Sequence, residues 1–216
     1  MLYMTTRDRF DAHTVAASLQ SDCGPEGGRY VPFKMPVFSD AEIAQLGEKG
    51  FGQSVADILN QFFCVNLSGW DVDCTVGRTV YNVAPISHKV LVAELWNNPQ
   101  WSYAWLENML ITMVSAKYPG SVSTSWLRIS TRIAVLFGLY AELLRRNVLE
   151  QGQVFDVSLP VGDFNAVMAV WYARQMNLPI ANIICACNDN SGVWDLLHLG
   201  SVRTDLAPVA TTTPEG

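Results

Sequence analysis

The stretch VFDVSLPVGDFNAVMAVWYARQMNLPIANII, residues 154–184, decides the fold that this sequence predicts. Its first part, Val154–Leu159, is rich in branched side chains and predicts a strand that ends in a turn at Gly162. Phe164–Met176 carries apolar residues at helical spacing, and the apolar run Ile180–Ala186 predicts a second strand. Strand, tight turn, helix and strand make a βαβ unit, so we expect a parallel sheet.

The turn between the first strand and the helix permits two interpretations. A glycine turn that leads into a helix N-terminus directs several backbone N–H groups at one point, and such a point suits an anion. Alternatively, Gly162 only makes the turn and Asp163 only caps the helix. The residues by themselves favour the cap, because most strand–turn–helix corners bind nothing.

Composition limits the classes of protein that fit this sequence. With 216 residues, of which 50% are hydrophobic and 16% charged, the chain can bury one sizeable core or a core and a small N-terminal domain. A mean hydropathy of +0.16 favours a buried interface. The net charge is −6 and the largest basic cluster is Arg145-Arg146, so nucleic acid is not an expected partner. The longest apolar run, residues 133–141, is too short to span a membrane.

Cysteine and histidine usage indicates neither disulfides nor a metal site. Five cysteines at irregular spacing fit reduced thiols better than a disulfide framework. His13, His88 and His198 show no ligand spacing, so no metal is expected. The charged residues of 7–11 are not followed by the apolar core of a signal peptide, and we expect a cytoplasmic protein.

Periodicity along the rest of the chain predicts further elements on both sides of the βαβ unit. Strands are expected at 1–6 and 83–95, and helices at 10–19, 39–46, 53–63, 101–115, 124–146 and 194–198. The expected fold class is α/β, with a mostly parallel sheet core, flanking helices and a small helical N-terminal region. We place the domain boundary between residues 1–80 and 81–216.

Several segments resemble one enzyme family. Residues 159–180, LPVGDFNAVMAVWYARQMNLPI, resemble VPxGNFGxxxAGYxAxxMGLPI, the phosphate-loop segment of threonine synthases of the fungal and enterobacterial types. The turn GPEGGRYVP at 24–32 resembles their APDGGLYVP, and Ser125, Trp126 and Arg128 match their helix motif NSINWxRxxxQxxYYFxxY. The resemblance implies a pyridoxal-phosphate enzyme of fold type II, a lyase of threonine biosynthesis.

On this resemblance, the cofactor-binding residues are Gly162, Asp163, Phe164 and Asn165. Two of them depart from the family's Gly-Asn-Phe-Gly. Asp163 adds a negative charge where the cofactor's phosphate lies, and two unit charges roughly 4 Å apart repel by about 4 kcal/mol at a surface-like dielectric. Asn165 adds a side chain where the backbone must approach the anion closely.

The expected catalytic position has lost its reactive group. Residues 94–105, ELWNNPQWSYAW, align with the family's ELFHGPTxAFKD, which places the Schiff-base lysine on Ala104 and the following aspartate on Trp105. A methyl group cannot form an imine. The chain has four lysines, which we interpret as solvated surface amines: Lys34, Lys49, Lys89 and Lys117. The family's SGDTGSA loop has no counterpart in the short link that leads to residue 124.

The leading hypothesis is therefore a threonine synthase-like pseudoenzyme that needs no cofactor and has no catalytic residues. It would act by binding protein or a small ligand, as a homo-oligomer or as the partner of a full-length threonine synthase homologue. The alternative is an active lyase that converts O-phosphohomoserine to threonine with pyridoxal phosphate, using a lysine from elsewhere. A third hypothesis is a gene remnant that folds without a function.

Overall fold

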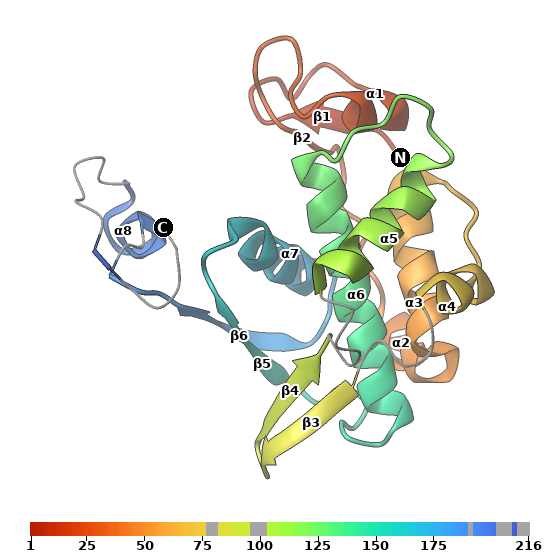
Figure 1. Ribbon diagram of the computed structural model, residues 1–216, viewed down its shortest axis with the longest axis vertical. Coiled ribbons are helices and arrows are strands. Elements are labelled where there is room, and N and C mark those ends of the chain that lie inside the picture. The colour runs from red at the N-terminus through yellow and green to blue at the C-terminus, as the bar shows by residue number, and fades with distance from the viewer. Residues whose placement is uncertain (77–81, 96–102, 190–191, 202–208, 211–216) are drawn as a thin grey trace.

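Figure 1 shows the computed structural model, which describes residues 1–76, 82–95, 103–189, 192–201 and 209–210. Its strands and helices follow one another as β1 (Tyr3–Thr5), α1 (Val15–Gln20), β2 (Tyr30–Pro32), α2 (Asp40–Ala44), α3 (Leu46–Phe63), α4 (Gly69–Val76), β3 (Asn82–Ser87), β4 (Val90–Glu94), α5 (Tyr103–Ser115), α6 (Ser125–Arg145), β5 (Phe155–Pro160), α7 (Phe164–Gln175), β6 (Ile180–Ala186) and α8 (Gly192–Leu199). The expected α/β class is confirmed.

The centre of the fold is the packing of α6 against α3. Trp126 on α6 and Phe62 on α3 are fully buried and meet edge to face, with ring centroids 5.4 Å apart. Gly138 lets the two helices approach, because a Cβ at this position would lie 2.8 Å from side-chain atoms of both Phe51 and Val55. Close packing of large apolar side chains along these two helices supplies the largest share of the described core.

The βαβ unit predicted from residues 154–184 is present. β5 and β6 pair in parallel, with Val157 opposite Ile183 and Leu159 opposite Cys185, and α7 connects them. α7 packs against α6, which brings the parallel strands to the edge of the helical core (Figure 1). In the described part of the chain this parallel sheet has two strands, so the mostly parallel core is seen only in part.

The prediction of a single strand across residues 83–95 was wrong. The segment folds into an antiparallel hairpin of β3 and β4, with Ser87 opposite Val90. His88 and Lys89 form the two-residue turn between two strands that each carry apolar side chains. Lys89 therefore lies at the tip of a hairpin and not at the start of a strand.

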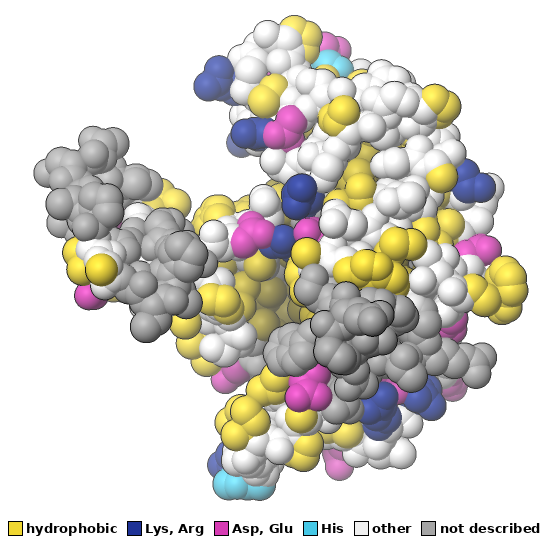
Figure 2. Space-filling view, in the orientation of Figure 1, with side chains coloured by type: hydrophobic (Ala, Val, Ile, Leu, Met, Phe, Trp, Pro, Cys, Tyr) yellow, Lys and Arg dark blue, Asp and Glu magenta, His cyan; other side chains and the backbone are white. Residues whose placement is uncertain are grey.

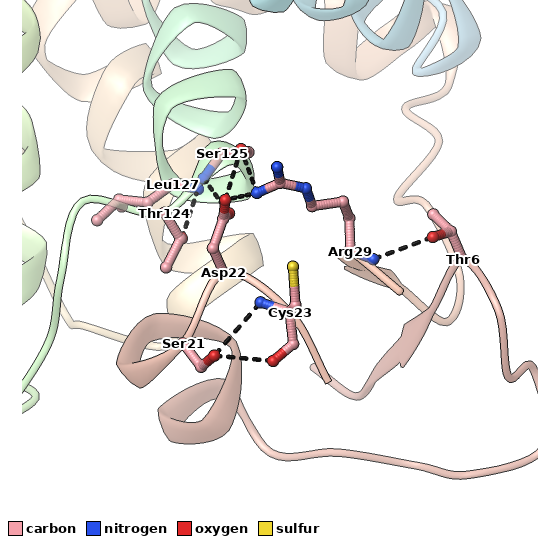
Figure 3. A network of polar contacts seen from close by, with 8 residues as sticks. All are labelled: Thr6, Ser21, Asp22, Cys23, Arg29, Thr124, Ser125 and Leu127. Carbon is pink, nitrogen blue, oxygen red and sulfur yellow. Dashed lines mark hydrogen bonds and ion pairs between the residues drawn. The ribbon is translucent and has the colours of Figure 1, made fainter. Parts of the chain in front are cut away.

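The N-terminal residues share the core with the later elements. Tyr3 of β1 is fully buried and its hydroxyl donates to the carbonyl of Phe62 on α3, at 2.9 Å. Figure 3 shows Asp22 pointing at the N-terminus of α6, where its carboxylate accepts the backbone N–H of Ser125 at 2.7 Å and pairs with Arg29. This arrangement caps α6 from a distant part of the chain. The domain boundary near residue 80 stays a prediction.

Two predicted helix starts agree with the observed caps, whereas the helices expected at 10–19 and 53–63 begin at Val15 and Leu46. Ser39 and Glu42 form a reciprocal capping box at α2, and the Thr124 side chain caps α6. Within the described ranges no helix combines the length and the apolar character that a membrane crossing requires. The same ranges contain no group of three or more His, Cys, Asp or Glu side chains that could hold a metal ion.

Candidate functional site

The loop from Gly162 to Asn165 connects β5 to α7, and Asp163 is the N-cap residue of that helix. One carboxylate oxygen of Asp163, Oδ1, accepts the backbone N–H of Asn165 at 3.0 Å. Phe164 is exposed and Asn165 is half-buried. The carboxylate therefore lies at the positive end of the α7 dipole, where an anion is stabilised.

The second carboxylate oxygen of Asp163 binds an arginine from another helix. Arg132, in the middle of α6, places Nη2 2.5 Å from Asp163 Oδ2. The Arg132 side chain is only 10% exposed, so its charge depends on protein partners for stabilisation. Its Nε donates to Oε1 of Glu107 on α5 at 2.8 Å, and Glu107 is buried. One guanidinium thus connects α5, α6 and α7.

Two further residues complete this cluster. Arg128, one turn before Arg132 on α6, has Nη1 3.5 Å from Oε2 of Glu107. The Tyr103 ring lies with its centroid 5.5 Å from Cζ of Arg132. Burial raises the pKa of the Tyr103 phenol, and the nearby Arg132 only partly opposes this. Burial lowers the pKa of Arg132, but hydrogen bonding to Glu107, the neighbouring Tyr103 and Asp163 outweigh burial and raise it. Arg132 therefore stays charged.

The predicted lysine position lies near this cluster in sequence and carries no amine. Ala104 is exposed in the first turn of α5, between Tyr103 and the half-buried Trp105. Trp96, Pro99 and Trp101 of the same predicted motif lie outside the described residues.

All four lysines are exposed and come from elements other than the β5–α7 loop. Lys34 follows β2, and Lys117 follows α5. Lys49 on α3 forms an ion pair with Asp57 at 2.7 Å, and Lys89 lies in the hairpin turn. The interpretation of these side chains as surface amines agrees with their exposure.

Sequence reasoning missed Arg132 and Glu107. A signal for Arg132 was available, because the helix motif that matches Arg128 has glutamine four residues later, where this chain has Arg132. The loop motif has asparagine where the chain has Asp163. The two departures have opposite charges and pair in the structure, so each compensates the other. Glu107 follows no quoted motif and is found only through its contacts.

Charged and apolar side chains lie next to one another on one face of the molecule. Figure 2 shows acidic and basic side chains meeting at the rim of a hollow whose floor is hydrophobic. Low-dielectric surroundings strengthen the interaction between paired charges and make an unpaired charge costly. An anion at the N-terminus of α7 would have to compete with Asp163 for Arg132.

Comparisons with known proteins give matches over part of the chain. No protein-family model matches it. Mouse "Threonine synthase-like 1" is 35% identical over 78 residues, which are 36% of this chain and 10% of the mouse protein. The threonine synthase of Schizosaccharomyces pombe is 36% identical over 96 residues, which are 44% of this chain and 17% of the yeast protein. Over these parts the sequence of the chain is similar to those of threonine synthase and threonine synthase-like proteins. The match spans less than a fifth of each of these relatives.

Solved threonine synthases have the same fold. The Escherichia coli enzyme superposes with a TM-score of 0.72 at 16% identity, covering 94% of this chain and 68% of the enzyme. The enzyme of Brucella melitensis, solved with pyridoxal phosphate bound, gives a TM-score of 0.71 at 15% identity over 93% of this chain and 63% of that one.

The geometry of the β5–α7 loop does not fit the phosphate group of pyridoxal phosphate. A phosphate at the α7 N-terminus needs donors that are free, and the Asp163 carboxylate already uses both the Asn165 N–H and Arg132 Nη2. The carboxylate also brings a negative charge against the incoming dianion.

Replacing Glu107 with glutamine should destabilise the fold far more than breaking an exposed ion pair. The Glu107→Gln variant leaves the buried Arg132 charge with one carboxylate fewer, and we expect the free energy of unfolding to fall by about 2–3 kcal/mol. Asp57→Asn is the matched control, because it breaks the more exposed pair with Lys49 and should cost less than about 1 kcal/mol. Urea unfolding measures both values. Equal losses in the two variants would contradict the assignment of a buried, coupled cluster.

Proposed function

We propose that this chain is a threonine synthase-like binding protein without lyase activity of its own. The observation that carries the proposal is the ion pair between Asp163 and Arg132, which places a protein carboxylate at the N-terminus of α7. Pyridoxal phosphate would have to displace this carboxylate from a charge-assisted hydrogen bond. The chain would thus have kept the fold of threonine synthases while losing the site that binds the phosphate group of the cofactor.

The lysines support the same proposal. An imine requires an amine beside the cofactor, and the expected position in α5 carries Ala104. The exposed positions of all four lysines fit solvated amines better than activated nucleophiles, which are usually desolvated. The lyase reaction needs both the amine and free donors for the phosphate group of the cofactor. Restoring only one of the two would therefore not restore lyase activity.

A working lyase is the second candidate, and the fold shared with the pyridoxal phosphate-bound Brucella enzyme favours it. It would convert O-phosphohomoserine to threonine. It requires that one lysine and a rearranged β5–α7 loop meet in the same site, so it requires Asp163 to leave Arg132.

The first test is a titration with pyridoxal phosphate followed by borohydride reduction and peptide mapping. We expect no visible aldimine band and no lysine labelled above the level of a denatured sample, because no amine lies at the site. The four single Lys→Arg variants serve as controls for scattered surface reaction. A band that reduction fixes onto one lysine, and that disappears in the matching variant together with threonine formation, would establish the lyase instead.

For the partner, we propose a second copy of the chain or a full-length threonine synthase. Exposed apolar side chains gather at α8, which Figure 1 shows at the far end of β6, and at the β3–β4 hairpin. Trp194, Leu197 and Leu199 are exposed on α8, and Ile86 and Val90 are exposed on the hairpin. Contiguous exposed apolar patches often mark surfaces that bind another protein.

Native mass spectrometry of the purified chain, alone and mixed with a full-length threonine synthase, tests this partner. We expect a dimer or a mixed complex, which Leu197→Lys weakens because it places a charge in the apolar patch. The control is Ser158→Lys, which adds the same charge on an exposed polar strand position. A strictly monomeric chain in both samples would refute the proposal.

A further inference from the structure

We propose that Asp163 is a self-supplied anion: its carboxylate occupies an anion site that the rest of the molecule still builds, and it keeps phosphate out of that site. We draw this from the same ion pair that supports the proposed function, on which it rests. Beyond that function, the Asp163 side chain closes the anion site at the N-terminus of α7, and removing its charge reopens the site.

The geometry at the α7 N-terminus is that of a bound anion. The two oxygens of Asp163 receive different donors, the Asn165 backbone N–H at 3.0 Å and Arg132 Nη2 at 2.5 Å. A backbone N–H at a helix N-terminus and an arginine fork are the donors that phosphate and carboxylate ligands use in proteins. The carboxylate thus bridges the two groups that an external anion would bridge.

Arg132 cannot relax away when its partner is removed. Its side chain is nine-tenths buried, and its Nε is fixed by the buried Glu107, which also lies 3.5 Å from Arg128. The Tyr103 ring lies against the guanidinium. A buried guanidinium held from two sides keeps its direction, so Nη2 would continue to point at the α7 N-terminus.

The molecule contains a second aspartate at a helix N-terminus that makes a matched control. Asp22 accepts the Ser125 N–H at the start of α6 at 2.7 Å and pairs with Arg29 (Figure 3). The chemistry is the same, but the Arg29 side chain is 55% exposed and free to reorient into water, whereas that of Arg132 is 10% exposed. Only the buried arginine should hold an empty anion site open.

The experiment measures binding of inorganic phosphate to the full chain by isothermal titration calorimetry and by phosphorus NMR. Asp163→Ser keeps an N-cap acceptor for α7 and removes the charge, and Asp163→Asn does the same with nearly unchanged volume. We expect at least one of these two variants to bind phosphate at least about tenfold more tightly than the wild-type chain. Circular dichroism checks that each variant is folded.

Two control variants separate a built site from a general change of charge. Asp22→Ser removes the same charge at the other helix N-terminus and should bind phosphate no better than the wild-type chain. Arg132→Gln combined with Asp163→Ser removes the buried donor and should abolish the gain. A gain of equal size in Asp22→Ser would show that net charge alone is responsible, and would overturn the site.

The inference is overturned if folded Asp163→Ser and Asp163→Asn both bind phosphate as weakly as the wild-type chain, because Asp163 is then only a helix cap and a structural ion pair. It is also overturned if the wild-type chain binds phosphate as tightly as the variants. These outcomes are distinct from a failure of the proposed function, which the pyridoxal phosphate titration of the wild-type chain decides through a lysine-bound aldimine.

Discussion

The buried charge of Arg132 is the constraint on which the candidate site depends. A guanidinium removed from water is costly unless carboxylates and hydrogen bonds compensate it, and here Glu107 and Asp163 do so from two different helices. The cluster therefore fixes α5 and the start of α7 against α6. It also decides the chemistry, because the charge that satisfies Arg132 comes from the protein and is already in place when any ligand arrives.

The helical core holds this cluster in position. α6 packs along α3 through a close approach at Gly138, and Asp22 caps its N-terminus from the N-terminal region. The parallel pair β5 and β6 joins this core through α7, so the loop that carries Asp163 is anchored on both sides. In a threonine synthase fold with these features, the β5–α7 loop can stay rigid although its hydrogen-bond donors now bind the Asp163 carboxylate.

The sequence predicted the parts of the fold that depend on local patterns. The βαβ unit of residues 154–184, the capping box at Ser39 and the long helix that became α6 each follow from periodicity and caps over neighbouring residues. The β3–β4 hairpin was missed, because a two-residue turn at His88 and Lys89 carries no glycine or asparagine signal.

The sequence predicted only the part of the candidate site that depends on a local motif. The resemblance indicated the Gly162–Asn165 loop, and the charge of Asp163 already argued against a phosphate there. What the sequence did not show was the partner of that charge, since Arg132 lies 31 positions earlier and only the fold brings the two side chains together. Glu107 is more distant still, and a pairing of this kind has no local periodicity to reveal it.

The most direct test of the account is a crystal structure of the wild-type protein grown from concentrated phosphate. The account predicts that the Asp163 carboxylate still bridges the Asn165 N–H and Arg132, with no phosphate at the N-terminus of α7. A phosphate bound to Arg132 with the Asp163 side chain turned away would contradict it. That result would mean that the wild-type chain keeps an open anion site.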